Sequence, residues 1–275
     1  MNNKIRLDIL LFEGGYFTSR EQARAGIMAG EVLVDGMKAE KAGQLCCKEA
    51  QIRLTGRRLP YVSRGGLKLA RAIEVFGLDF SGKTVIDIGA STGGFCDCAL
   101  QNGASKIYAV DVGYGQLAWK LRQDNRVTVL EKTNARYLDQ HIIEEQVDII
   151  TADVSFISLT KALPAAIKNL LKEKGELLAL IKPQFEAGRS QIGKKGVVRD
   201  KNVHRQVLEH ICKTSLQWGL DPLALTHSPF TGPQGNIEYL FYALKKDASS
   251  YPDIDKAVEV AWYELIISGK EAPNY

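Results

Sequence analysis

The sequence predicts an α/β protein in which a doubly wound, mostly parallel sheet follows a small α+β head. Three observations lead to this prediction. From residue 64 onward, short runs of β-branched residues alternate with helical stretches, an order typical of a parallel sheet with helices on both faces. A glycine-rich turn directly follows the first of these runs. Positive charge is concentrated ahead of them, in the first quarter of the chain.

This charge asymmetry is clear from simple counts. Residues 1–72 hold 13 Lys and Arg against 7 Asp and Glu, a net charge of +6. Residues 73–275 hold 23 against 25, a net charge of −2. A basic head on a near-neutral body indicates that the head meets a polyanion, and nucleic acid is the usual one.

The composition is that of a folded globular protein. Of 275 residues, 45% are hydrophobic and 25% are charged, which excludes a disordered or fibrous chain. No apolar stretch is long enough for a membrane helix or resembles a signal peptide, so we expect no membrane association and a cytoplasmic protein. The five cysteines lack zinc-ligand spacing, so we expect buried reduced thiols and no metal site. The sequence leaves the oligomeric state open.

The head is expected to span residues 1–60. Leucines at helical spacing predict a first helix over 7–13, and Ser19 is a suitable N-cap for a second helix over 20–28. Alternating apolar residues then predict strands over 32–34 and 52–54, with a tight turn between them. A short basic connector that ends in a proline marks the domain boundary.

The body is expected to span residues 61–246, with a helical tail over 247–275. A stripe of Ile254, Val258, Trp262 and Ile266 in this tail could cover the sheet or meet a partner. We expect the two internal tryptophans, Trp119 and Trp218, to lie in the core. The predicted strands are 84–88, 107–110, 127–130, 147–150, 177–181, 222–227 and 237–243, and the predicted helices are 65–76, 201–218 and 254–267.

The glycine-rich turn indicates a nucleoside cofactor that carries a positive charge. Its spacing fits neither the dinucleotide fingerprint nor a phosphate-binding Walker loop. Asp87, two residues before the first glycine, suits an amine better than a pyrophosphate, and Asp111 ends the next strand, where an acid can bind ribose hydroxyls. S-adenosylmethionine has both groups. The expected cofactor-binding residues are Asp87, Gly89, Ser91, Thr92, Gly93, Gly94, Phe95, Asp111, Asn134 and Asp153.

Two of these assignments have a plain structural alternative. Asp87 could instead cap the helix that follows the turn. Asn134 could reach the adenine edge of the cofactor, or it could simply be a turn asparagine.

Four ionisable residues are candidates for catalysis: Lys68, Asp153, Lys182 and Glu238. The carboxyl ends of parallel strands meet at one crevice, so residues far apart in the sequence can converge there. A ribose 2′-hydroxyl is a very weak acid, and a lysine whose pKa is lowered by a second cation could remove its proton while carboxylates orient the amines. The alternative is that each is part of an ordinary surface ion pair.

The head resembles the S4-like RNA-binding domain. The resemblance rests on Arg6-Leu7-Asp8, Ser19-Arg20, Ala23, Gly30, Val32, Val34 and Gly36. It implies that the second helix and the following loop present basic residues to RNA phosphates; alternatively, those residues only solubilise an exposed face. The basic residues expected to contact RNA are Arg6, Arg20, Arg24, Lys38, Arg57 and Arg58, and, in the body, Arg64, Lys194, Lys195 and Arg199.

Residues 4 to about 245 resemble the TlyA/hemolysin A family of RNA 2′-O-methyltransferases, whose catalytic domain is of the FtsJ/RrmJ type. The motifs are Ser63 to Leu69, Asp87 to Phe95, Val110 to Leu117, Lys132-Thr133-Asn134, Asp153 to Leu159, Lys182 to Glu186 and Gly235 to Glu238.

The resemblance implies a class I S-adenosylmethionine-dependent methyltransferase fold with a mostly parallel seven-stranded sheet. It also implies a Lys68–Asp153–Lys182–Glu238 tetrad with Lys182 as the base. The implied substrate is ribosomal RNA, methylated on cytidine in the small and sometimes the large subunit. Two alternatives stay open at this point: a non-catalytic RNA- or ribosome-binding factor that keeps the fold, and, less favoured without a secretion signal, a cytolysin of the kind the family name suggests.

Overall fold

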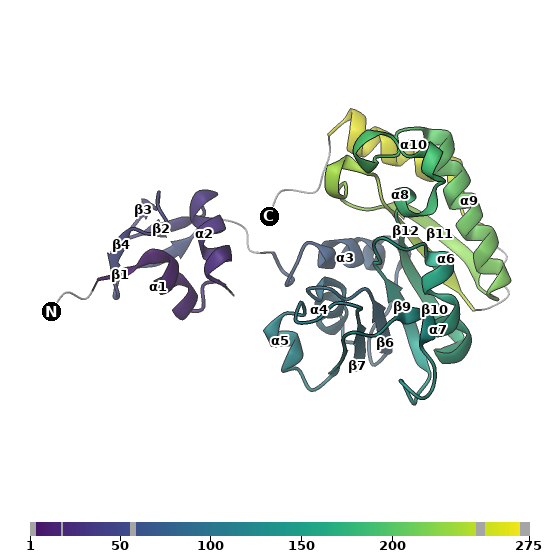
Figure 1. Ribbon diagram of the computed structural model, residues 1–275, viewed down its shortest axis with the longest axis horizontal. Helices are drawn as coiled ribbons and strands as arrows, with labels where there is room; N and C mark the ends of the chain where they lie inside the picture. The colour runs from purple at the N-terminus through teal and green to yellow at the C-terminus, as the bar shows by residue number, and fades with distance from the viewer. Residues whose placement is uncertain (1–3, 18, 56–58, 246–250, 270–275) are drawn as a thin grey trace. The chain divides into compact units, whose positions relative to one another are not determined.

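The chain divides into two compact units, residues 1–59 and 60–274, in the computed structural model (Figure 1). The structure describes residues 4–17, 19–55, 59–245 and 251–269. Each unit has its own hydrophobic core. No helix in the described ranges is both long and apolar enough to cross a membrane.

Unit 1 is a small α+β unit whose two helices and main strand pair agree with the prediction. The hydroxyl of Ser19 accepts a hydrogen bond from Gln22 N at 3.2 Å and so caps the second helix as expected. Three further short strands, each of two or three residues, were not predicted. The elements are β1 (Lys4–Arg6), α1 (Leu7–Glu13), α2 (Arg20–Met28), β2 (Val32–Val34), β3 (Met37–Lys38), β4 (Leu45–Cys47) and β5 (Ile52–Leu54).

Unit 2 is built on a seven-stranded sheet with the strand order β11-β12-β10-β9-β6-β7-β8. Strands β6 to β10 are parallel to one another, whereas β12 pairs antiparallel with both β10 and β11. This confirms the mostly parallel sheet. The strands are β6 (Thr84–Ile88), β7 (Lys106–Val110), β8 (Val127–Leu130), β9 (Val147–Ala152), β10 (Leu171–Ile181), β11 (Asp221–His227) and β12 (Tyr239–Leu244).

Helices cover both faces of this sheet (Figure 1). Along β6, Val85 packs into the cluster that contains α3 and α4, whereas Ile86 and Ile88 pack into the cluster that contains α7 and α9, as the two-residue period of a strand requires. The helices are α3 (Gly65–Phe76), α4 (Gly94–Gln101), α5 (Trp119–Arg122), α6 (Leu159–Ala162), α7 (Pro164–Leu170), α8 (Pro183–Glu186), α9 (Lys201–Gln217) and α10 (Ile254–Trp262). Short 3-10 turns lie at Ala135–Tyr137, Arg189–Gln191, Lys194–Gly196 and Pro233–Gly235.

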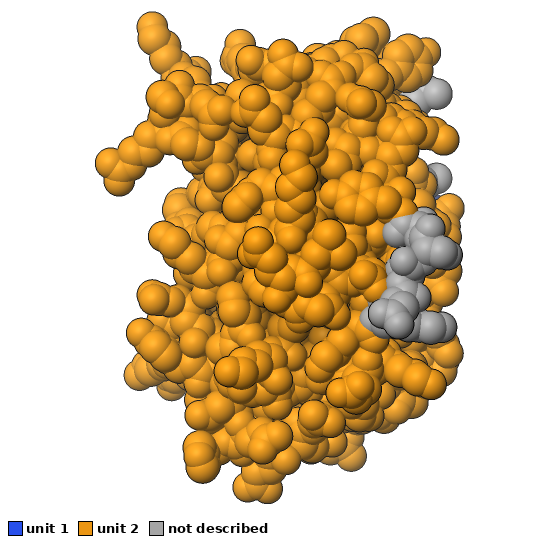
Figure 2. Space-filling view, turned by 90° about the vertical axis from the view of Figure 1, so that its right-hand side faces the viewer, with its two compact units in different colours: residues 1–59, 275 blue, residues 60–274 orange. Residues whose placement is uncertain are grey.

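The C-terminal stripe packs against the core of unit 2, of which it is part. Val258 is fully buried in the core beside α9, and Ile254 and Trp262 pack against that core. The last turn, Tyr263–Ile267, is a π-helix. Its wider turn buries Leu265 and leaves Ile266 exposed, so the expected stripe is wrong at its final position. On the side of unit 2 that carries α9, shown in Figure 2, side chains form a continuous surface.

Two expectations about single residues are corrected. Trp119, expected in the core, is 71% exposed, because the core-facing position of the four-residue α5 belongs to Leu121. Trp218 does pack against the core. Of the five cysteines, Cys47 is exposed and the other four are buried as reduced thiols.

The first turns of α3 and α4 touch through three glycines, Gly65, Gly66 and Gly94. A Cβ on Gly94 would lie 2.7 Å from Gly66 N and 3.0 Å from the carbonyl carbon of Gly65. Asp97 in α4 reinforces the contact, because its Oδ2 accepts a hydrogen bond from Val62 N at 2.8 Å. This contact places the start of α3, and with it Lys68, against the turn that follows β6.

The glycine contact predicts that Gly94→Ala destabilises unit 2. The added methyl would meet backbone atoms that cannot move aside, and such overpacking costs about 1–3 kcal/mol. The free energy of unfolding, measured with urea, checks this. Gly188→Ala is the matched control, because its Cβ would meet only the end of the Gln191 side chain, at 3.4 Å. Equal stabilities for the two variants would contradict the contact.

Candidate active site

Two adjoining cavities open at the carboxyl edge of the sheet in unit 2. The chain leaves β6 toward β7 on one side and returns through β9 on the other, so β6 and β9 form the point where the strand order reverses. The cavities have volumes of about 490 Å³ and 350 Å³. Both are lined by Gly89 and Ser91, from the turn after β6, and by Asp153 and Ser155, from the loop after β9.

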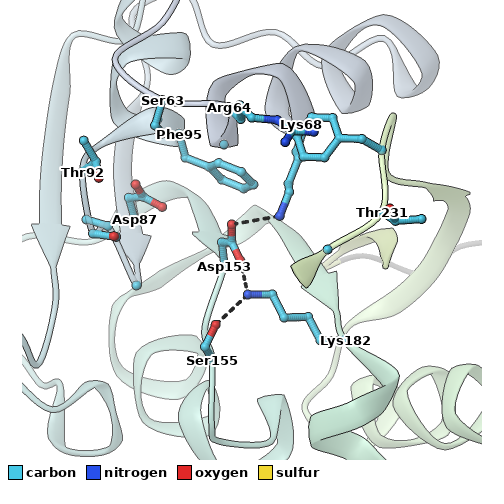
Figure 3. A pocket seen from close by; sticks show the side chains of 17 residues that line it. Ser63, Arg64, Lys68, Asp87, Thr92, Phe95, Asp153, Ser155, Lys182 and Thr231 are labelled. Atoms are coloured by element: carbon cyan, nitrogen blue, oxygen red, sulfur yellow. Dashed lines mark hydrogen bonds and ion pairs between the residues drawn. The ribbon is translucent and has the colours of Figure 1, made fainter. Parts of the chain in front are cut away.

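The structure brings the four candidate catalytic residues together, and Figure 3 shows three of them, Lys68, Asp153 and Lys182. Lys68 Nζ lies 2.8 Å from Glu238 Oε2 and 3.6 Å from Asp153 Oδ2. Lys182 Nζ lies 2.6 Å from Asp153 Oδ1. Asp153 therefore bridges the two lysines, and the four side chains form one chain of alternating charge beside the larger cavity.

Glu238 reaches this edge because β12 is antiparallel to its neighbours β10 and β11, so β12 begins where β10 ends. Tyr239 pairs with Ile181, the last residue of β10, so the residue before β12 lies where β10 ends. Its side chain is buried, and a Cβ on Gly232 would stand 2.4 Å from Glu238 Oε1. Only a glycine leaves room for the carboxylate here.

The opposite charges of the tetrad outweigh the effect of burial on Lys68 and Asp153. Burial lowers the pKa of Lys68, but Asp153 and Glu238 outweigh it and the pKa is raised. Burial raises the pKa of Asp153, but Lys68 and Lys182 outweigh it and the pKa is lowered. The two carboxylates therefore hold Lys68 in its charged form.

Ser155 is a contact that the sequence analysis missed. Its Oγ accepts a hydrogen bond from Lys182 Nζ at 2.8 Å. The residue lies in the Asp153 to Leu159 motif, two residues beyond the acid, but a serine in a loop carries no signal of its own. Phe230, Thr231 and Gly232, which line the larger cavity from the loop before β12, were missed for the same reason.

The turn after β6 brings its backbone to the junction of the two cavities. Gly89 has φ +84°, and a Cβ there would lie 2.6 Å from Asp153 O, so a side chain would fill the junction of the two cavities. Ser91 also adopts a positive φ, +48°, an uncommon conformation for a residue with a side chain. Thr92, Gly94 and Phe95 line the larger cavity, whereas Gly93 lines neither cavity because it faces Leu117 and Leu121.

Asp87 lies on the floor of the larger cavity and is almost fully buried. It accepts hydrogen bonds from Thr151 Oγ1 at 2.8 Å and from Cys96 Sγ at 3.0 Å. Burial outweighs these bonds and raises the pKa of Asp87 to about 6. The N-cap position of α4 belongs to Gly93, so Asp87 is not the N-cap residue of this helix; it contacts the Cys96 side chain and lines the cavity.

Asp111 and Asn134 line the smaller cavity from the loops after β7 and β8. Asp111 Oδ2 accepts from Ser91 N at 2.8 Å, and Oδ1 accepts from Gly113 N at 2.7 Å. Each carboxylate oxygen keeps a lone pair for a further donor. Asn134 Oδ1 accepts from Arg136 N at 3.1 Å, so it is a turn asparagine that also faces the cavity.

The candidate RNA-contacting residues fall into separate groups. In unit 1, Arg6, Arg20 and Arg24 gather on Asp8. Lys38 is not part of that group, because its side chain covers Gly30 beyond the end of α2. Arg57 and Arg58 lie outside the described residues.

The basic residues of unit 2 lie near the larger cavity and in a separate loop. Arg64 lines that cavity, with its guanidinium carbon 4.2 Å from the centre of the Phe230 ring. Lys194, Lys195 and Arg199 are exposed in the loop between β10 and α9. Across the described parts of both units, no cluster of three His, Cys, Asp or Glu side chains could hold a metal ion.

Comparisons with known proteins agree with this geometry. Residues 61–245 match the family model described as FtsJ-like methyltransferase, and residues 5–52 match the S4 domain. The chain is 41% identical over 243 residues to the 16S/23S rRNA (cytidine-2′-O)-methyltransferase TlyA of Mycobacterium tuberculosis, covering 88% of this chain and 90% of that protein. It is 40% identical over 237 residues to Hemolysin A of Brachyspira hyodysenteriae, covering 86% and 98%. A solved structure, named "Putative hemolysin from Streptococcus thermophilus", matches with a TM-score of 0.75 and 43% identity, covering 98% of this chain and all of that one.

The raised pKa of Asp87 predicts a pH-dependent loss of stability. Between pH 3.8 and about 6 the unfolded chain has released this proton while the folded chain still holds it, so rising pH destabilises the fold. The total loss is about 3 kcal/mol, at about 1.4 kcal/mol per unit of pKa difference. Urea unfolding between pH 4 and 8 checks this: the free energy of unfolding relative to Asp87→Asn should fall by about 2 kcal/mol, because part of the loss lies below pH 4. Glu144→Gln, which removes an exposed carboxylate, is the control, and parallel curves for wild type and Asp87→Asn would contradict the assignment.

Proposed function

The chain belongs to the FtsJ-like methyltransferase family, and from this premise we propose that it transfers the methyl group of S-adenosylmethionine to the ribose 2′-oxygen of a cytidine in ribosomal RNA, of the small or the large subunit. The observation that carries the proposal is the Lys68–Asp153–Lys182–Glu238 contact chain beside a cavity of about 490 Å³. The RNA class is supported by the S4 domain and by the names of the rRNA-modifying relatives.

The donor set of the two cavities fits S-adenosylmethionine. Asp87 would hold its amino group, Asp111 its ribose hydroxyls and Asn134 its adenine edge, while the bare backbone at Gly89 leaves room between them. When bound, the cofactor supplies an electrophilic methyl group on a sulfonium, a leaving group that needs no metal.

Lys182 is the better of the two lysines for the role of base. Lys68 is held by two carboxylates and its pKa is raised, so it stays charged. Lys182 is held by only one carboxylate, together with a neutral hydroxyl. Neutral Lys182 would accept the proton of the 2′-hydroxyl as the oxygen–methyl bond forms and the methyl–sulfur bond breaks, with that electron pair staying on sulfur. The charged Lys68 ammonium would stabilise the developing negative charge on oxygen.

A basic loop is fixed beside this site by one buried side chain. Asn236 Nδ2 donates to Gly196 O at 3.0 Å, and Asn236 Oδ1 accepts from Val198 N at 3.2 Å. Asn236 lies two residues before Glu238, so the loop that carries Lys194 and Lys195 is tied to the segment that carries the tetrad. We infer that this loop holds RNA phosphates next to the target nucleotide.

Lys182→Ala is expected to abolish transfer without loss of cofactor binding. General bases contribute about 10²- to 10⁴-fold to rates, so transfer of labelled methyl to ribosomal subunits should fall by at least about 100-fold. Calorimetry should still detect S-adenosylmethionine binding. Lys161→Ala, which removes an exposed lysine of α6, is the matched control. Transfer within threefold of wild type would remove Lys182 from the role of base.

The double variant Lys194→Ala/Lys195→Ala is expected to weaken RNA binding while the rate at saturating RNA stays unchanged. Each phosphate contact contributes about one unit to the slope of log affinity against log salt, so the slope should become shallower by up to about two. Lys174→Ala/Lys213→Ala is the control, because these exposed lysines lie in the early part of β10 and in α9, away from the loop. If both variants show the same slope, the loop makes no phosphate contact.

A further inference from the structure

Three arginines of unit 1 converge on one carboxylate. Arg6 donates from Nε to Asp8 Oδ1 at 3.0 Å and from Nη2 to Oδ2 at 3.1 Å. Arg20 Nη2 and Arg24 Nε both donate to Asp8 Oδ2 at 3.0 Å. These residues come from β1, from the first turn of α1 and from α2, so the cluster joins three elements.

Asp8 and the arginines differ sharply in exposure. The side chain of Asp8 is fully buried, whereas 41–47% of each arginine side chain is exposed. Hydrogen bonds from Arg6, with further ones from Arg20 and Arg24, hold the pKa of Asp8 well below its usual range although burial raises it. The carboxylate is therefore charged and out of reach of a ligand, while the guanidiniums remain accessible.

The arrangement leaves the arginines with both charge and free donors. Three positive charges against one negative leave a net charge of +2. Each guanidinium has five N–H donors and uses only one or two on Asp8, so several remain for an acceptor. Without the carboxylate, three like charges this close would repel one another and spread out.

We propose that Asp8 is a positioning residue that holds Arg6, Arg20 and Arg24 as a single clamp for a phosphate group of the RNA backbone. The proposal rests on the proposed function, in which RNA is the ligand of unit 1. Guanidiniums match phosphate oxygens through paired hydrogen bonds, and fixing them before binding removes the cost of ordering three long side chains. The arginines are thus more than a solubilising face.

Two explanations of the cluster predict opposite signs for one substitution. If only charge matters, Asp8→Asn raises the net charge of the patch from +2 to +3 and strengthens RNA binding. If position matters, the same substitution frees the arginines and weakens binding despite the added positive charge. The pair Arg20→Lys/Arg24→Lys separates the two again, because it keeps the charge and removes the paired donors.

The experiment measures binding of the full-length chain to purified small and large ribosomal subunits across a range of salt concentrations. Asp8→Asn and the double lysine variant are each expected to weaken binding about tenfold. The salt slope of the double lysine variant should stay at the wild-type value, because its charges are kept. In methyl transfer, both variants should raise KM for the subunit and leave kcat unchanged. Glu40→Gln, which removes an exposed acid of unit 1, is the charge-matched control and should bind equally well or more tightly.

The outcomes separate this proposal from the proposed function. Tighter binding by Asp8→Asn together with wild-type affinity for the double lysine variant would overturn the clamp. If Asp8→Asn loses the cooperative melting of unit 1, the double lysine variant decides alone, because its exposed side chains tolerate the exchange. Failure of the wild-type chain to bind either subunit would instead overturn the RNA assignment itself.

Discussion

The site depends on the carboxylate of Asp153, which holds two lysine ammonium groups at the carboxyl edge of the sheet. Two buried cations without this acid between them would repel each other and lack a partner for their lost hydration. With Glu238 the group holds two positive and two negative charges, so it can stay buried. The same arrangement makes the two lysines unequal, because Lys68 lies between two carboxylates and Lys182 lies between a carboxylate and the hydroxyl of Ser155.

The scaffold supplies each member of this group from a different element. Parallel strands β9 and β10 end side by side and deliver Asp153 and Lys182. The antiparallel β12 brings Glu238 to the same edge, and the glycine contact between α3 and α4 brings Lys68. The turn at Gly89 touches the backbone of Asp153, so the proposed binding and catalytic parts share one junction. A change that shifts any of these elements should therefore disturb both cofactor binding and catalysis.

Much of this could be predicted from the sequence, for identifiable reasons. Runs of β-branched and other apolar residues located β6, β7 and β9 because these strands are largely buried on both faces. The ends of the strands and the family motifs pointed to the four residues that the structure brings together. What local patterns do not encode was missed. The start of β10 is hidden in the charged segment before Leu177, Ser155 is one hydroxyl among many, and the sharing of Asp8 by three arginines depends on how α1 packs against α2. Trp119 was misplaced because a four-residue helix gives no amphipathic signal.

The most direct test of the proposed ribose methylation is to identify the methylated atom. Ribosomal RNA from subunits treated with the protein and isotope-labelled S-adenosylmethionine would be digested to nucleosides and analysed by mass spectrometry. We expect the label in 2′-O-methylcytidine, with the added mass of the labelled methyl group on the ribose fragment. Label on the base fragment of any nucleoside, or in a ribosomal protein, would contradict the assignment of the tetrad to ribose chemistry.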